Sequence, residues 1–178
     1  PALFRTSGFF VSQFTDHIPA GLSVLDMGTG TGIGAVFAAQ YAGHVTAVDI
    51  NPEAVRTAQI NVLLNHMEAC IEVRQSDLFT NLHGCQFDVI LFNPPYFRGD
   101  PDDQHDYAWR SNDTVERFST ELYHHLTPGG YALVVLSSDG DHDTFLQRFA
   151  ANQLQVQAIA RRDLINEILT VYKLTVPA

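Results

Sequence analysis

The 178-residue chain has few cysteines, few basic residues and no long apolar run. Its two cysteines, Cys70 and Cys85, lack the close spacing of a redox or zinc pair, so we interpret them as reduced thiols. Lys and Arg number 10 against 20 Asp and Glu, a formal charge of -10, which argues against autonomous binding to bare nucleic acid. No apolar run approaches the roughly 20 residues of a membrane span. We therefore expect a soluble, cytoplasmic protein.

Metal binding is not expected either. The adjacent His124 and His125 would point in different directions from a helix and would not share one metal. The length and the 46% hydrophobic content predict one domain over residues 1–178 with a sizeable core. The chain starts with Pro1 rather than Met, which leaves open whether this is the native start or a fragment boundary.

Apolar periodicity, interrupted by glycine, proline and asparagine, predicts alternating strands and helices. The expected strands are residues 23–27, 44–50, 71–75, 87–92, 131–137, 154–160 and 167–176. The expected helices are residues 33–41, 51–66, 113–126 and 141–153, with "TPGG" as the stop of the third. "RRDLIN" is too short for a crossover helix, so the last two strands are antiparallel. We expect an α/β fold: a doubly wound, mostly parallel seven-stranded sheet with helices on both faces and one reversed strand in its edge region.

A glycine loop follows the first strand in "VLDMGTGTGIG". Gly28, Gly30 and Gly32 lie where such a sheet binds ligands, and glycine lets a ligand approach the backbone closely. Asp49 ends the second strand at the spacing expected of a carboxylate that binds a ribose diol. Together these features predict a nucleoside site; the alternatives are a dinucleotide site in a shifted register and a glycine turn without a ligand.

Two further carboxylates refine the nucleoside prediction. Asp26, just before the glycines, disfavours a pyrophosphate and suits a ligand with positive charge, such as the sulfonium and ammonium of S-adenosylmethionine. Asp77, in "SDL" after the third strand, is placed to accept from an adenine amino group, with Leu78 as an apolar wall. Asp77 as the cap of a short turn is the alternative.

The fourth strand ends in "FNPPYF". The side-chain carbonyl of Asn93 and the main-chain carbonyl of Pro94 are two acceptors that can each bind one N–H of a planar amide or amine. Pro94 and Pro95 stiffen the segment, Tyr96 can stack on the planar group, and Phe97 can close the pocket. The motif predicts a clamp that aims a nitrogen lone pair; the alternative is a proline turn at a strand end.

The ordered motifs "VLDMGTGTGIG", "VTAVDINPEAV", "SDL" and "FNPPYF" resemble those of class I, seven-stranded S-adenosylmethionine-dependent methyltransferases with a Rossmann-like fold. The resemblance implies S-adenosyl-L-methionine as cofactor and S-adenosyl-L-homocysteine as product. It implies a catalytic segment of Asn93, Pro94, Pro95 and Tyr96. The cofactor-binding residues that it implies are Asp26, Gly28, Thr29, Gly30, Gly32, Asp49, Ile50, Asp77, Leu78 and Asn93.

Within this class the later chain resembles the short glutamine N5-methyltransferases of the HemK type, through "YAWRSNDTVERF", "LTPGGYALVVLS" and "RRDLINEILTVYKL". That likeness implies that the acceptor is a protein of the kind of a translation release factor and that a small activator subunit is a partner. It also implies substrate contacts from Phe97, Trp109 and Arg110. The chain departs from the pattern: Arg110-Ser111-Asn112 replaces the glycines after Ala108-Trp109, and "FRTSGFF" lacks the usual acid.

Alternatives of function follow from the same residues. A nucleic-acid methyltransferase acting on adenine N6 or guanine N2 would use the same "NPPY" chemistry. A non-catalytic subunit would keep only the cofactor site, and a nicotinamide oxidoreductase would need a substrate domain that a chain of this length lacks. For Trp109 a structural anchor is the alternative, and the acidic run from Asp100 to Asp106 favours a solvated lid.

Overall fold

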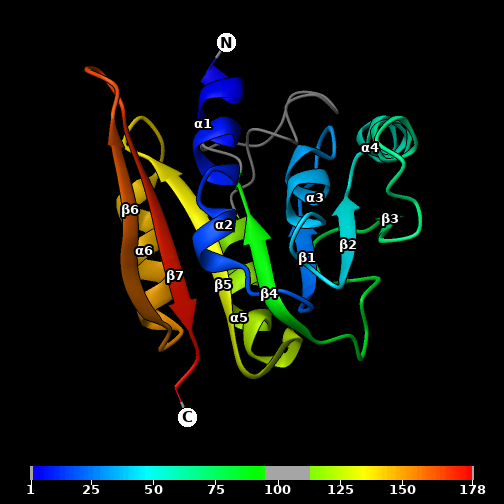
Figure 1. Ribbon diagram of the computed structural model, residues 1–178. Helices are drawn as coiled ribbons and strands as arrows, with labels where there is room; N and C mark the ends of the chain where they lie inside the picture. Colours follow the sequence, from blue (N-terminus) through cyan, green and yellow to red (C-terminus); the bar gives the residue numbers. More distant parts are fainter. Residues whose placement is uncertain (1, 95–112, 178) are drawn as a thin grey trace.

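The computed structural model describes residues 2–94 and 113–177, with side chains from Arg5 onward, and its strands form one seven-stranded sheet (Figure 1). The strand order is β3-β2-β1-β4-β5-β7-β6. β1 to β5 are parallel to one another, and β7 is antiparallel to both β5 and β6. The strands are β1 (Ser23–Met27), β2 (His44–Asp49), β3 (Ile71–Gln75), β4 (Phe87–Phe92), β5 (Leu126–Ser137), β6 (Gln155–Asp163) and β7 (Ile168–Thr175).

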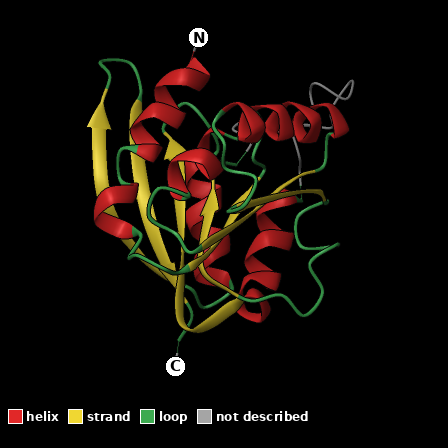
Figure 2. Ribbon diagram, turned by 45° about the vertical axis from the view of Figure 1, so that its right-hand side comes forward, coloured by secondary structure: helices red, strands yellow, loops and turns green. Residues whose placement is uncertain are grey.

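Helices cover both faces of this sheet (Figure 2). One face packs against α1 (Ala2–Val11), α2 (Phe14–His17), α3 (Ile33–Ala38) and α4 (Pro52–Leu64). The other packs against α5 (Thr114–His125) and α6 (His142–Ala151). The predicted α/β fold, a mostly parallel sheet of seven strands with helices on both faces, is confirmed.

Strand β4 shows why the sequence forms a buried central strand. From Val89 to Phe92 its side chains alternate between the two cores: Ile90 and Phe92 join the core under α5 and α6, whereas Val89 and Leu91 join the core under α1 and α3. A strand covered on both faces needs apolar residues at consecutive positions, which explains the unbroken run "VILF". In the sequence, "NPPY" directly follows this run.

The helix α4 begins as the sequence predicts. Asn51 is the N-cap, and its side-chain oxygen accepts from the N–H of Glu53 at 2.9 Å. Pro52 occupies the first turn, where its missing N–H removes no helical hydrogen bond. The helix therefore starts directly after Asp49 and Ile50, which fixes the carboxyl end of β2.

Helices α1 and α2 were absent from the sequence prediction. α1 buries Thr6, Phe9 and Phe10, and α2 buries Phe14. The spacing of Thr6, Phe9 and Phe10 follows one helical face and was the signal available. Ser7 and Gly8, both weak helix formers, obscure it in the sequence.

The start of β5 differs from the prediction, whereas the reversed strand lies in the edge region as predicted. The "TPGG" segment ends α5 as expected, but it lies within β5, which starts at Leu126. There the register with β4 shifts between Phe87 and Val89, and a Cβ on Gly130 would lie 3.0 Å from the carbonyl oxygen of Phe87. Glycine thus permits a close approach of two backbones. The reversed strand β7 lies one position inside the edge, and β6 forms the edge itself.

Among the described residues, none of the helices combines the length and apolar character needed to cross a bilayer. Cys70 and Cys85 are both free thiols.

Candidate active site at the carboxyl edge of the sheet

The carboxyl ends of β1, β2 and β4 lie side by side at one end of the strands, which is the upper edge of the sheet in Figure 1. Met27 is paired with Val48 on one side and with Phe92 on the other. The residues that follow these strand ends, Gly28 and Asn93 among them, are therefore neighbours, since adjacent strands lie about 5 Å apart. The sheet register brings together the glycine loop and the "NP" segment, as the sequence predicts.

The glycine loop leaves open space beside its backbone. Gly28, Gly30 and Gly32 have φ values of 65°, 56° and 83°, the left-handed region that favours glycine. A Cβ at Gly28 or at Gly30 would meet no atom within 4 Å, whereas one at Gly32 would approach Ala58 at 3.1 Å. Gly32 thus serves the packing of α3 against α4, and the backbone at Gly28 and Gly30 borders open space.

Asp49 connects this loop with the end of β2. One carboxylate oxygen accepts from the N–H of Gly30 at 2.9 Å, and the other accepts from the N–H of Asn51 at 2.9 Å. The side chain is only partly buried, and burial raises its pKa against those hydrogen bonds. Each carboxylate oxygen has a second lone pair, so Asp49 keeps acceptor capacity for the two hydroxyls of a ribose.

Asp26 is deeper than Asp49, with 6% of its surface exposed. Its carboxylate accepts from the hydroxyl of Thr29 at 2.6 Å and from the backbone of Ala35. Desolvation raises its pKa to about 6, although these hydrogen bonds act in the opposite direction. A Cβ at Gly34 would lie 2.6 Å from the carboxylate. Asp26 therefore joins the end of β1 to the loop and to α3.

The turn after β3 carries the residues predicted to contact adenine. The N–H of Ser76 donates to the carbonyl of Asp49 at 2.9 Å, which places this turn beside β2. Leu78 is buried and has φ 47°, and Ile50 is 38% exposed. Leu78 in this turn and Ile50, which directly follows Asp49, are thus two apolar residues near the ribose-binding position predicted for Asp49.

Arg117 of α5 pairs with a predicted site residue, a contact that the sequence prediction missed. Its guanidinium lies 3.0 Å from the carboxylate of Asp77 and 3.9 Å from that of Asp113. Burial lowers the pKa of Arg117, but the pairing with Asp77 outweighs burial and leaves the pKa raised. No local pattern relates Arg117 to Asp77, because the two are brought together only by the packing of α5 beneath the sheet.

The predicted clamp lies partly within the described residues. Asn93 follows β4 and is half-buried, and Pro94 is buried. Pro95, Tyr96, Phe97, Trp109 and Arg110, the remaining predicted catalytic and substrate-binding residues, lie outside the described residues. Across residues 2–94 and 113–177, no group of three or more His, Cys, Asp or Glu side chains could hold a metal ion.

These features fit S-adenosylmethionine. The open backbone at Gly28 and Gly30 offers room for the amino-acid part, Asp49 has acceptors for a ribose, and the carboxylates of Asp26 and Asp49 suit a positively charged donor. When bound, this cofactor supplies a methyl group on a positively charged sulfur.

A family comparison decides the class. The model of the methyltransferase small domain matches residues 4–163. The chain belongs to the methyltransferase small domain family. The predicted class, a methyltransferase dependent on S-adenosylmethionine, is thereby confirmed at the level of the family.

Three curated relatives of this methyltransferase domain differ in the acceptors that their names state. A Methanocaldococcus jannaschii protein, provisionally named a protein N5-glutamine methyltransferase, is 38% identical over 68% of the chain and 65% of its own length. The release factor glutamine methyltransferase of Koribacter versatilis is 39% identical, over 62% of the chain and 45% of its own length. The tRNA1(Val) (adenine(37)-N6)-methyltransferase of Phocaeicola vulgatus is 32% identical, over 76% of the chain and 59% of its own length. The chain thus aligns with 45 to 65% of the length of these relatives.

The fold agrees with solved methyltransferases. The E. cuniculi Mtq2-Trm112 complex, described as responsible for methylation of the eRF1 translation termination factor, contains a chain that superposes with a TM-score of 0.74. The two share 18% identity, and the superposition covers 97% of the present chain and 96% of the other. This likeness confirms the Rossmann-like methyltransferase fold.

Proposed function

We propose that this methyltransferase transfers a methyl group from S-adenosylmethionine to the side-chain amide of a glutamine in an acceptor protein, and that this acceptor is a translation release factor. The observation that carries the proposal is the position of Asn93 and Pro94, directly after β4 and beside the open glycine loop. Residues 1–178 act as one domain in this proposal, and the acceptor places the enzyme in the cytoplasm.

The proposed role of the clamp follows from the chemistry of an amide. The nitrogen of a glutamine side chain is a weak nucleophile because its lone pair is delocalised into the carbonyl. The side-chain carbonyl of Asn93 and the main-chain carbonyl of Pro94 each accept one N–H and hold the lone pair toward the methyl group. Such orientation can lower a barrier by several kcal/mol. No general base is needed, since the nitrogen loses its proton readily after methylation.

In this proposal the other residues at the carboxyl ends of the strands hold the cofactor. Asp49 binds the ribose hydroxyls, Gly28 and Gly30 admit the amino-acid part, and Asp77, Leu78 and Ile50 surround the adenine. The hydrogen bond from Thr29 to the buried carboxylate of Asp26 fixes the conformation of the glycine loop. The ion pair with Arg117 fixes the carboxylate of Asp77, so one of its oxygens remains for the adenine amino group.

Two findings support a protein acceptor. Two of the relatives are named for glutamine methylation, one of them on a release factor. The formal charge of -10 disfavours a polyanionic acceptor. A small activator subunit is also part of the proposal, by analogy with the Mtq2-Trm112 assembly.

A base N-methyltransferase is the second candidate. It is favoured by the similarity to the tRNA1(Val) adenine N6-methyltransferase, which extends over 76% of the chain. The exocyclic amine of adenine is also planar and carries two N–H groups, so the same clamp would serve it. The charge of the present chain is what ranks this candidate second.

Labelled methyl transfer distinguishes the candidates. Purified protein is incubated with S-adenosylmethionine labelled in its methyl group and, in separate reactions, with a release factor, tRNA, rRNA or DNA. We expect label in the release factor, on one glutamine-containing peptide by mass spectrometry, and none when Asn93→Ala replaces the wild type. Label in tRNA, with the release factor unlabelled, would establish the second candidate instead.

A further inference from the structure

The tip of the β6–β7 hairpin exposes an isoleucine in a disfavoured backbone conformation. Ile165 has φ 71°, and 96% of its surface is exposed. The N–H of Asn166 donates to the carbonyl of Leu164 at 2.8 Å, which closes a three-residue γ-turn centred on Ile165. A β-branched residue is poorly suited to positive φ, and glycine or asparagine would adopt it more easily. In the free protein the Ile165 side chain therefore contributes little to the stability of the fold.

Hydrogen bonds hold this tip in place. The N–H of Leu164 donates to the carbonyl of Glu167 at 2.8 Å, and the N–H of Ile165 donates to the carboxylate of Asp163 at 3.0 Å. The carboxylate of Glu167 in turn accepts from the hydroxyl of Ser137, at the end of β5, at 2.7 Å. The isoleucine is thus presented to solvent from a fixed support, which lowers the entropic cost of a contact with another molecule.

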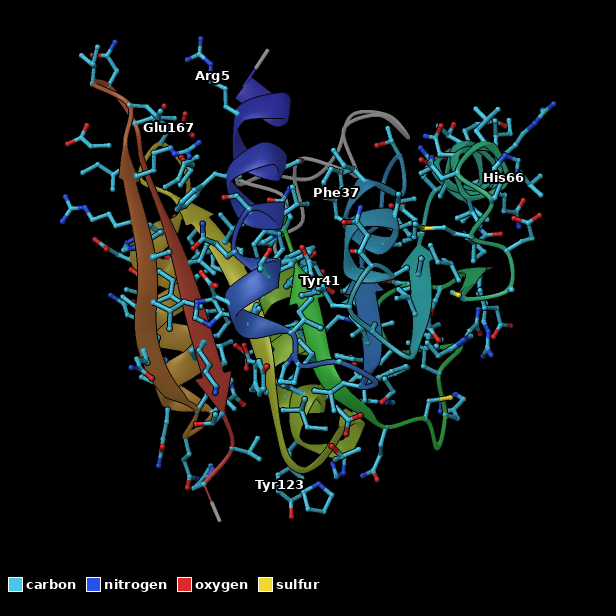
Figure 3. All side chains as sticks on the ribbon, in the orientation of Figure 1. Arg5, Phe37, Tyr41, His66, Tyr123 and Glu167 are labelled. Carbon is cyan, nitrogen blue, oxygen red and sulfur yellow. The ribbon has the colours of Figure 1, made fainter. Side chains whose placement is uncertain are left out.

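The tip projects beyond the edge of the sheet that carries the proposed active site. Val134 of β5 is paired with Phe92, the last residue of β4. Ser137, three residues later, lies about 10 Å farther along the strand direction, and the hairpin continues past it. In Figure 1 the hairpin rises above the upper ends of β4 and β5, and in Figure 3 Glu167 lies at this end of the molecule, as does Arg5 of α1. A macromolecule whose acceptor group reaches Asn93 would face Ile165.

Side chains of both signs border the tip. Asp139, in the loop that follows β5, and Asp163 are exposed, and so are Arg161 and Arg162, which directly precede Asp163. The whole chain has a formal charge of -10. That charge disfavours a continuous row of phosphates, whereas a folded protein, whose surface also combines apolar patches with charges of both signs, would match an isoleucine exposed between carboxylates and guanidinium groups.

We propose that Ile165 is a docking contact for the folded protein that carries the methylated glutamine. This inference rests on the proposed function and adds to it a second recognition point, separate from the clamp. Ile165 contacts an apolar patch of the acceptor protein away from its glutamine, and so affects the binding of the acceptor rather than the transfer step.

The test compares two acceptors with three variants. The acceptors are a purified release factor and a synthetic peptide that spans only its acceptor glutamine. Ile165→Asn and Ile165→Gly remove the apolar contact and accept the positive φ, so their thermal stability should not fall below that of the wild type. Leu64→Asn is the matched control, since Leu64 is 70% exposed on α4, which contacts β2 and β3 at the other end of the sheet.

We expect both Ile165 variants to raise KM for the release factor about tenfold with little change in kcat, and to leave KM for the peptide unchanged. The Leu64 variant should leave KM for both acceptors unchanged. An unchanged KM for the release factor in both Ile165 variants would overturn the inference, as would an increase confined to a tRNA acceptor. If the wild type labels no protein, the proposed function fails first, and the docking role falls with it.

Discussion

The two carboxylates closest to the glycine loop have different surroundings and therefore different tasks. Asp49 accepts two backbone N–H groups and stays partly open to solvent. Asp26 is buried beneath the loop and accepts from Thr29 and Ala35. In the proposed enzyme, Asp49 contacts the cofactor, whereas Asp26 keeps the shape of the loop that contacts it.

Asp26 should give the stability of the fold a specific pH dependence. Desolvation raises its pKa from 3.8 to about 6. Because the folded-state pKa lies above the unfolded value, the group stabilises the fold fully below about pH 4, and this contribution is lost as pH rises through about 6. Asp26→Asn carries no such charge. We expect the unfolding free energy of Asp26→Asn, minus that of the wild type, to rise by about 2 to 3 kcal/mol between about pH 4 and pH 7.5.

Urea denaturation at a series of pH values measures this difference. Asp16→Asn, which removes a carboxyl from the exposed surface of α2, is the matched substitution control. A pH-independent difference for Asp26→Asn would mean that the buried carboxyl titrates as it does in the unfolded chain.

At the level of residues, the sequence predicted the positions of Gly28, Gly30, Asp49 and Asn93 at one edge, because parallel strand ends must meet there. It did not predict Arg117. Ion pairs across the sheet depend on how a helix packs, and the spacing of charges along the chain carries no information about that packing. The role of Ile165 was also absent from the sequence prediction, since its φ and its exposure are known only from the fold.

Helix α3 depends on a glycine at a position of close approach. A Cβ at Gly34 would meet both oxygens of Asp26, at 2.6 and 2.8 Å, within a buried environment. We therefore expect Gly34→Ala to lower the free energy of unfolding by about 1 to 3 kcal/mol, through overpacking of the loop and α3. Its melting temperature and its affinity for S-adenosylhomocysteine should both fall.

Gly8→Ala in α1 is the matched substitution. A Cβ at Gly8 meets no atom within 4 Å, and Gly8 lies in the helix interior. Alanine there should stabilise the fold by about 0.5 to 1 kcal/mol, because it removes the conformational freedom of glycine in the unfolded chain. Equal melting temperatures for Gly8→Ala and Gly34→Ala would contradict the contact assigned to Asp26.

At the level of elements, strands were easier to predict than the N-terminal helices. A short, continuous apolar run such as that ending at Phe92 is typical of a buried strand. "RRDLIN" was too short for a crossover helix, so the last two strands had to be antiparallel. α1 and α2 carry aromatic residues among polar ones, and their burial depends on the sheet that they cover. The bulge at Gly130 likewise follows from the approach of β4, a contact between distant segments.

The charge of the whole molecule bears on the acceptor. A protein acceptor lacks the condensed counterions of a nucleic acid, so its binding to a chain of formal charge -10 should release few counterions. We expect KM for a release factor to change by less than about threefold between about 50 and 200 mM salt, whereas binding through six or more phosphates would weaken by about 10³-fold. Steady-state kinetics at several salt concentrations, with kcat as the internal control, measures this. A steep salt dependence would favour a nucleic-acid acceptor.

The central claim is that Asn93 orients the acceptor nitrogen, while Asp49 binds the cofactor. The most direct measurement is single-turnover methyl transfer beside calorimetric binding of S-adenosylhomocysteine, for Asn93→Ala and Asp49→Ala. We predict that Asn93→Ala slows transfer about 100-fold or more with affinity within about threefold of the wild type. Asp49→Ala should weaken binding by about 1 to 3 kcal/mol. Equal losses of rate and affinity in Asn93→Ala would contradict the account.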